Sequence, residues 1–267
     1  MHRDLPIGIF DSGIGGLTVA SAIRSELPNE SIIYFGDTLH LPYGEKPPHD
    51  VRKYSLNIAR FLADYPVKAI VIACNTASAV AYSAVKKQHP ELPVFNVIDP
   101  VVNAVEAAPN QVVGVIGTRT TIRSGVYRNK LKDKHPNLKT HSVATPLWAH
   151  MIEEGFYQNQ ISRTVLHKYL DDPALKTVNQ LILGCTHYPL IEEEIDEFYA
   201  GRVTILNSAR IVALEVKQRL EQLNGLARED KGTDHFLVSD YTKSFEQSAR
   251  AFFGEAIRLE EKVLSWQ

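Results

Sequence analysis

Short apolar runs alternate along the chain with longer amphipathic segments. Eight runs rich in Val and Ile predict strands at 7–10, 31–36, 69–73, 93–98, 112–117, 138–143, 179–184 and 203–206. Segments of helical length lie between most of them, for example 14–27, 50–64, 76–89 and 188–199. Because the runs are continuously apolar rather than alternating, we expect strands that are covered on both faces. The predicted fold class is α/β, with doubly wound, mostly parallel sheets.

The pattern repeats within the chain. "IGIFDSGIGGLT" and "VGVIGTRTTIRS" both read as a strand, a tight polar turn and a helix start. Asp11 and Gly117 occupy matching positions, and nearly the same spacing separates the only two cysteines, Cys74 and Cys185. We therefore predict two similar α/β domains, one formed by 1–98 with 207–267 and the other by 99–206. The active site is expected between them, and segment 207–267 is expected to be mostly helical.

Composition is typical of an ordinary soluble globular protein, with 44% hydrophobic and 22% charged residues and a net charge of −2. The basic residues are scattered and the pI is about 6.6, so we expect no nucleic-acid partner. No apolar run approaches the ~20 residues of a membrane span, and "MHRDLP" leads straight into a strand pattern. We expect a cytoplasmic protein with no membrane partner, no disulfide and no metal site.

Both cysteines follow a predicted strand and precede a helical pattern. Polar groups able to hold an anion come directly after them: Asn75, Thr76, Thr186 and His187. Backbone N–H groups at a helix start would bind a carboxylate and lower the pKa of a nearby thiol. A single cysteine in such a place is more often a small buried hydrophobe than a reactive group. Two cysteines in parallel settings favour a shared chemical role.

The turn "DSGIGGLT" (11–18) also permits a dinucleotide-binding interpretation, because Asp37 follows 21 residues after Gly16. However, Thr18 replaces the third glycine of that motif, and Asp11 would place a negative charge beside the pyrophosphate. We therefore expect no nucleotide cofactor.

Several further side chains have two possible roles each. Asp37 begins a long loop containing Tyr43 and Gly44, which is either functional or a solvated turn. His187 is either an acid–base group or a histidine bonded to backbone at a helix start, and Glu153 alone would be a surface charge. One threonine should cap a helix start, and the others could bind an anion: Thr118, Thr120 and Thr121.

Two equivalent bases on opposite walls of a crevice suit removal of a proton from one face of a carbon and delivery to the other face. This chemistry inverts a stereocentre. Donors that could stabilise the carbanion are Ser12, Asn75, Thr76 and Thr186. A hydrolase or decarboxylase with one active cysteine, and an amino-acid binding module without catalysis, remain alternatives.

The chain resembles the cofactor-independent aspartate/glutamate racemase family, and glutamate racemases within it. The resemblance is carried by "GIFDSGIGGLTV", "FGDT" with "PYGEK", "ACNTASA", residues 117–127, "IEEG" and "GCTHYPL". It implies two α/β domains around a glutamate site, no cofactor, and D-glutamate supplied for peptidoglycan by a homodimer. A family member acting on aspartate or a related amino acid is the alternative. The sequence departs from the family's usual pattern at Trp148, Ala149 and His150.

The resemblance also implies a role for individual residues. Cys74 would exchange the α-proton with D-glutamate, assisted by Asp11, and Cys185 with L-glutamate, assisted by His187. Asp37 and Glu153 would tune the two sides. The substrate would be lined by Asp11, Ser12, Tyr43, Gly44, Asn75, Thr76, Thr118, Thr121, Thr186 and His187.

Overall fold

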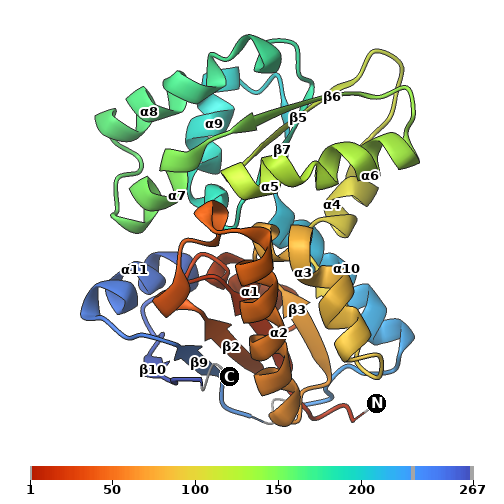
Figure 1. Cartoon of the computed structure of the whole chain (residues 1–267), viewed down its shortest axis with the longest axis vertical. Coiled ribbons are helices and arrows are strands. Elements are labelled where there is room, and N and C mark those ends of the chain that lie inside the picture. Colours follow the sequence, from red (N-terminus) through yellow and green to blue (C-terminus); the bar gives the residue numbers. More distant parts are fainter. Residues whose placement is uncertain (1, 230–231, 265–267) are drawn as a thin grey trace.

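The computed structural model describes residues 2–229 and 232–264, which form two lobes, each built on one sheet (Figure 1). Sheet A has the strand order β10-β9-β2-β1-β3-β4, and sheet B has the order β6-β5-β7-β8. Neighbouring strands pair in parallel throughout both sheets. The predicted fold class, two mostly parallel α/β domains, is confirmed. We call the two halves lobe A and lobe B after their sheets.

Lobe A carries helices on both faces of its sheet. The strands are β1 (Ile7–Asp11), β2 (Ile32–Gly36), β3 (Ala69–Ile72), β4 (Val94–Asn96), β9 (His235–Val238) and β10 (Leu259–Glu261). The helices are α1 (Leu17–Glu26), α2 (Pro48–Asp64), α3 (Asn75–Gln88), α10 (Ser208–Gln222) and α11 (Lys243–Phe253). Ile7 and Ile9 of β1 share a core with α1 and α10, whereas Phe10 shares a core with α2 and α3. Successive strand residues point to opposite faces, so β1 is buried along its whole length.

Lobe B repeats this arrangement with four strands. These are β5 (Val112–Gly117), β6 (Lys139–Ala144), β7 (Gln180–Gly184) and β8 (Thr204–Leu206). The helices are α4 (Asp99–Ala104), α5 (Arg119–Ser124), α6 (Val126–Lys134), α7 (Pro146–Glu153), α8 (Gln160–Leu170) and α9 (Glu192–Tyr199). In β7, Ile182 packs on the side of α6, and Leu181 and Leu183 pack in the core that contains α8 and α9.

All eight predicted strands are present, within two residues at each end. The expectation that 207–267 is mostly helical is wrong for two segments, since β9 and β10 extend sheet A beyond β2. Both strands are short, and β10 exposes two of its three residues. Such segments carry little apolar pattern. β9 pairs with β2, about two hundred residues earlier in the chain, and β10 pairs with β9.

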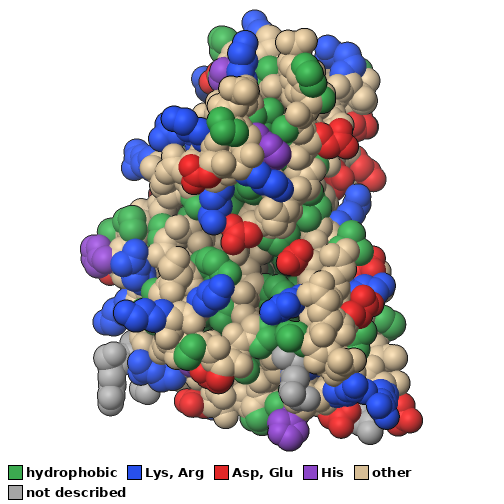
Figure 2. All heavy atoms as spheres, turned by 90° about the vertical axis from the view of Figure 1, so that its right-hand side faces the viewer, with side chains coloured by type: hydrophobic (Ala, Val, Ile, Leu, Met, Phe, Trp, Pro, Cys, Tyr) green, Lys and Arg blue, Asp and Glu red, His purple; other side chains and the backbone are tan. Residues whose placement is uncertain are grey.

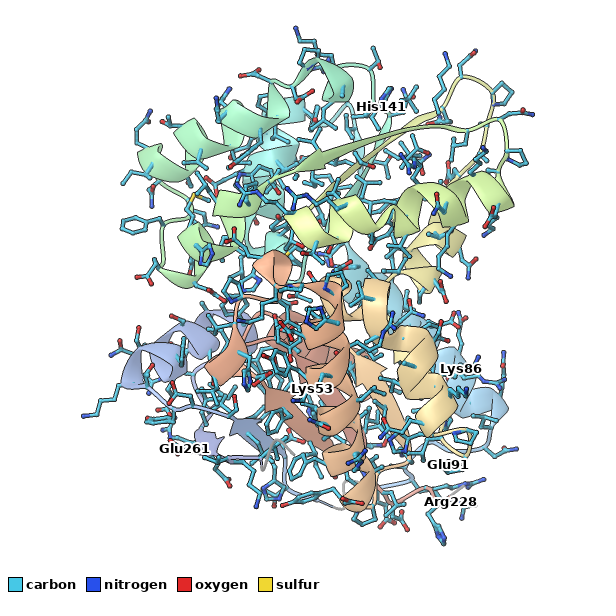
Figure 3. The ribbon with its side chains drawn as sticks, viewed as in Figure 1. Lys53, Lys86, Glu91, His141, Arg228 and Glu261 are labelled. Atoms are coloured by element: carbon cyan, nitrogen blue, oxygen red, sulfur yellow. The ribbon has the colours of Figure 1, made fainter. Side chains whose placement is uncertain are left out.

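The proposed domain boundaries fit this division of the strands. The strands of sheet A lie within 1–98 and 207–267, and those of sheet B within 99–206. We keep these boundaries as a proposal. His141 on β6 and Glu261 on β10 mark edge strands of the two sheets in Figure 3.

The surface carries both signs of charge. On the face shown in Figure 2, Lys and Arg side chains are interspersed with Asp and Glu side chains. Among the helices of the described residues, none is long and apolar enough to pass through a membrane.

Candidate active site

One crevice between the lobes is lined by both cysteines. It encloses about 570 Å³ counted out to its opening. The predicted site residues that line it come from both lobes: Ser12, Tyr43, Gly44, Cys74, Asn75, Thr76, Thr118, Glu153, Cys185, Thr186 and His187. Three predicted residues, Asp11, Asp37 and Thr121, are buried behind this lining. The fold thus brings together nearly all of the predicted site residues, which lie between positions 11 and 187 of the sequence.

Cys74 lies where β3 ends and serves as the N-cap of α3. Its sulfur accepts a hydrogen bond from the Ala77 N–H at 3.4 Å, and the thiol donates to Ser12 Oγ at 3.7 Å. Burial, followed by the negative charge of Asp11, raises the pKa of the Cys74 thiol. The expected lowering of this pKa by the helix start is wrong, because the backbone N–H contributes less than the loss of water.

Cys185 lies at the end of β7 and has a different neighbourhood. Its sulfur is 3.5 Å from Nδ1 of His187, whose Nε2 is 2.8 Å from Oε1 of Glu153. A short 3₁₀ helix, η4 (Tyr188–Ile191), follows in place of the expected α-helix start. Cys74 therefore lies at the N-terminus of an α-helix, whereas Cys185 does not. Cys185 has the imidazole of His187 beside it instead.

Glu153 and His187 hold opposite charges. Burial works to lower the pKa of His187, but the Glu153 carboxylate and Cys185 outweigh it and raise that pKa well above its usual value. Burial likewise works to raise the pKa of Glu153, and the charge of His187 reverses the direction and lowers it. Glu153 is thus no surface charge. The pair places an imidazolium ion against the sulfur of Cys185.

Asp11 lies beneath the Cys74 side of the crevice and is fully buried. Its Oδ2 accepts hydrogen bonds from the N–H groups of Gly16 at 2.8 Å and Gly13 at 3.2 Å. Its Oδ1 has no hydrogen-bond partner within the described residues. Burial raises the pKa of Asp11, and the positive charge of His187 opposes this. Within the described residues Asp11 makes no hydrogen bond to Cys74, and its negative charge raises the pKa of that thiol.

The glycine turn after β1 also packs against the other lobe. A Cβ atom at Gly15 would lie 2.3 Å from Cε1 of His187, so the ring occupies the space of a side chain. Thr18 Oγ1 donates to the carbonyl oxygen of Thr186 at 2.8 Å. The turn thereby fixes the position of His187, a role that the sequence analysis did not assign to Gly15.

Asp37 does not reach the crevice. It accepts hydrogen bonds from the Tyr43 hydroxyl at 2.6 Å, from His40 Nδ1 at 2.8 Å and from the Ser239 hydroxyl at 2.9 Å. The loop after β2 is ordered by two 3₁₀ helices, η1 (Thr38–His40) and η2 (Tyr43–Glu45). Asp37 is therefore placed to position Tyr43, and the loop is not a solvated turn.

Threonine side chains connect the two lobes. Thr118 caps α5, its Oγ1 accepting from the Thr121 N–H at 3.2 Å. Thr76 Oγ1, from lobe A, lies 3.0 Å from Oγ1 of Thr118 and 3.2 Å from Oγ1 of Thr121. Thr120 Oγ1 donates to the carbonyl oxygen of Gly44 at 2.8 Å. Thr118 is thus the expected cap. The hydroxyl groups of Thr76, Thr118 and Thr121 join the two walls of the crevice.

The sequence departure before Glu153 contributes to one wall. Ala149 and His150 line the crevice, while Trp148 is buried with its ring edge-on to Tyr188. His150 also lowers the pKa of Glu153, after the larger effects of burial and His187. The departure thus adds an imidazole to the rim of the crevice.

Five residues that line the crevice were missed by the sequence analysis: Leu41, Pro42, Glu45, Arg119 and Pro146. Three residues that contact the site from outside this lining were also missed. The Tyr127 hydroxyl donates to Oδ1 of Asn75, Ser248 donates to the carbonyl oxygen of Glu153, and Phe252 lies edge-on to the ring of His187. Tyr127 fell inside the stretch 117–127 that carried the resemblance, which was the available signal. Ser248 and Phe252 lie on α11, a segment in which no sequence motif indicates the site.

Comparison with known proteins identifies the class. Residues 17–216 match the model of the Asp/Glu/Hydantoin racemase family. The chain belongs to this family, and it is an amino-acid racemase, an isomerase. It is 38% identical to the glutamate racemase of Persephonella marina over 262 residues, covering 98% of each chain. It is 42% identical to that of Geobacter metallireducens over 253 residues, covering 93% of this chain and 92% of the relative.

A solved structure agrees with this assignment. The chain superposes on glutamate racemase from Francisella tularensis, crystallised with D-glutamate, with a TM-score of 0.92 and 37% identity. The match covers 99% of this chain and 98% of that one. Within the described residues, no group of three or more His, Cys, Asp or Glu side chains is arranged to hold a metal ion. That the enzyme works without a cofactor stays a prediction.

Proposed function

We propose that the protein interconverts L- and D-glutamate by moving the α-proton between two cysteines, without a cofactor. One observation carries this proposal: Cys74 of lobe A and Cys185 of lobe B line the same crevice. They are near enough for the charge on Cys185 to affect the pKa of Cys74. The glutamate racemases among its relatives, including the one crystallised with D-glutamate, support the choice of substrate.

In the direction from D to L, the Cys74 thiol first loses its proton to solvent as the amino acid binds. The resulting thiolate takes the α-proton, and the C–H electron pair remains on the α-carbon and its carboxylate. Cys185 then delivers a proton to the opposite face, and its sulfur becomes a thiolate. In the reverse direction, Cys185 takes the proton and Cys74 delivers one. The net change in either direction is inversion at carbon, with one proton moved from carbon to one sulfur and another from sulfur to carbon.

The two sides prepare their thiols differently. His187 is close enough to Cys185 to exchange a proton with it, and Glu153 holds the imidazole in place. On the other side, Cys74 stays a thiol in the free enzyme because burial raises its pKa. The ammonium group of a bound amino acid would favour the thiolate, since a nearby positive charge lowers a thiol pKa.

Groups that donate hydrogen bonds surround the place of the substrate. Ser12, Thr76, Thr118 and Thr186 provide hydroxyl groups, and Asn75 an amide. Donors aimed at a carboxylate would stabilise the charge that develops when the α-proton leaves.

We also propose a homodimer in the cytoplasm that supplies D-glutamate for peptidoglycan.

The test is interconversion of the glutamate enantiomers, followed by circular dichroism with purified protein and no added cofactor. We expect the signal of either enantiomer to decay to zero, because the two become equal in amount. Aspartate serves as the comparison substrate and should turn over far more slowly. No decay with glutamate, or faster decay with aspartate, would refute the proposed substrate. Replacing either cysteine with Ala should abolish the decay, whereas a mechanism with one active cysteine predicts substantial activity in one of the two variants.

A further inference from the structure

The side-chain amide of Asn75 has a hydrogen-bond partner for its oxygen and, within the described residues, none for its nitrogen. Oδ1 accepts a hydrogen bond of 2.6 Å from the hydroxyl of Tyr127. Nδ2 is buried and has no hydrogen-bond partner within the described residues, although Asn75 lines the crevice. A buried amide NH₂ left without an acceptor costs free energy. Its chemistry therefore points to a ligand that accepts hydrogen bonds, such as a carboxylate oxygen.

The fold brings Tyr127 to this position from the opposite lobe. α5 ends at Ser124 and α6 begins at Val126, and Gly125 between them has a φ of +67°, in the left-handed region. This sharp change of direction places Tyr127 in the first turn of α6, with 2% of its surface exposed. Its ring packs beside Gly184, where an added Cβ would lie 3.5 Å from Cε2. Tyr127 of lobe B thus reaches the start of α3 in lobe A.

The hydroxyl of Tyr127 is a donor at neutral pH. Burial, followed by the charge on Cys185, raises the pKa of the phenol, so that it keeps its proton. A protonated hydroxyl directed at Asn75 distinguishes the two ends of the amide, because it donates to the oxygen and leaves the nitrogen free. Without it, rotation of the amide by half a turn would present an acceptor to the substrate in place of a donor.

We propose that Tyr127 is a positioning residue that fixes the amide of Asn75 so that Nδ2 donates to a carboxylate of the bound amino acid. The proposal rests on the glutamate racemase function proposed above. Tyr127 acts through Asn75, and it is not a catalytic residue. Because Asn75 would hold a carboxylate in either enantiomer, loss of the hydroxyl should weaken the binding of both.

Tyr127→Phe removes the hydroxyl and keeps the ring. We expect KM for both glutamate enantiomers to rise about 10-fold, the usual scale for one well-placed hydrogen bond, with a smaller change in kcat. Asn75→Ala should raise KM by at least as much. The double variant should be no worse than Asn75→Ala alone, because Tyr127 has nothing left to position. Tyr199→Phe is the matched control, since it also removes a buried phenol hydroxyl, one without a partner, on α9. Its KM should equal that of the wild type.

The outcomes separate the two proposals. If the wild type interconverts glutamate but Tyr127→Phe has an unchanged KM, or if its effect adds to that of Asn75→Ala, the positioning role is refuted and the proposed function stands. If the wild type does not interconvert glutamate, both are refuted. Should Tyr127→Phe fold poorly, Asn75→Asp replaces it, because this change keeps an acceptor for Tyr127 and removes the donor. A KM for Asn75→Asp equal to that of the wild type would refute the proposal.

Discussion

The imidazole of His187 lies between two partners, with Nδ1 3.5 Å from the sulfur of Cys185 and Nε2 2.8 Å from Oε1 of Glu153. In the part of the chain that the structure describes, Cys74 has no comparable neighbour, since its sulfur contacts a hydroxyl and a backbone N–H. The negative charge of the Asp11 carboxylate raises the pKa of the Cys74 thiol. The two thiols are therefore prepared by different means on the two sides of one crevice, and each side can be disturbed separately.

Glu153→Gln should shift the pH dependence of activity. Glu153 raises the pKa of His187, so its removal lets that pKa fall. If the protonated imidazole is the active form, kcat/KM should decline at lower pH in the variant than in the wild type, with a loss of about 10-fold at neutral pH. The measurement is kcat/KM against pH in both directions. A pH profile that stays in place would show that Glu153 does not control His187.

The same substitution should alter stability in a defined pH range. The raised pKa of His187 contributes stability that is complete below its unfolded value of 6.5 and is lost as pH rises through the folded value. The lowered pKa of Glu153 contributes stability that is complete above 4.5 and is lost as pH falls through the folded value. The free energy of unfolding of the wild type should therefore exceed that of Glu153→Gln by about 1–2 kcal/mol between pH 4.5 and 6.5. The difference should be smaller below and above this range. Urea unfolding at several pH values measures this, and a constant difference would contradict it.

Asp11→Asn should stabilise the folded protein and reduce its racemase activity. Asp11 is buried with one oxygen unpaired, and burial raises its pKa. An uncharged amide removes the cost of that charge, so the free energy of unfolding at pH 7 should rise by about 1 kcal/mol. This gain should vanish as pH falls through the pKa of Asp11, because the wild-type carboxyl is then neutral as well. Racemase activity should fall in the same variant. A loss of stability at pH 7 would refute this account of Asp11.

Gly15→Ala tests the packing between the glycine turn and His187. The new methyl group would lie 2.3 Å from Cε1 of His187, so the ring must move. We expect activity to drop roughly 100-fold, as for a displaced acid–base group, with stability reduced by about 1–3 kcal/mol. Gly13→Ala is the matched comparison in the same turn, because its methyl group would meet Leu41 at an ordinary 3.4 Å. Equal losses in the two variants would contradict the specific contact.

Asp37→Asn separates positioning from catalysis. Three donors converge on Asp37 from Tyr43, His40 and Ser239, and the carboxylate does not line the crevice. An amide cannot accept from all of them, so stability should fall by about 2 kcal/mol and KM should rise more than kcat falls. Thermal unfolding and steady-state kinetics measure both quantities. A large loss of kcat with unchanged KM would instead indicate that Asp37 takes part in the chemistry.

Local sequence pattern predicted most of the fold and the lining of the crevice. The apolar runs of β1 and β7 end at Asp11 and just before Cys185, and parallel strands bring such ends to one edge of a sheet. β9 and β10 escaped prediction because both are short, and because β9 pairs with the distant strand β2 while β10 pairs with β9. The direction of the Cys74 pKa was wrong because burial, which outweighs the helix start, depends on the packing of the whole lobe. Tyr127, Ser248 and Phe252 contact the site from segments distant in the sequence. Tyr127 lay within the stretch 117–127 that carried the resemblance, whereas no local pattern marks Ser248 or Phe252.

The transfer of hydrogen between two sulfurs is tested most directly in deuterated water at low conversion, starting from each pure glutamate enantiomer. If Cys74 and Cys185 each serve one face of the α-carbon, the product enantiomer carries deuterium and the remaining substrate keeps its proton, in both directions. Deuterium appearing equally in product and recovered substrate would mean that a single base serves both faces, and the two-cysteine account would be wrong.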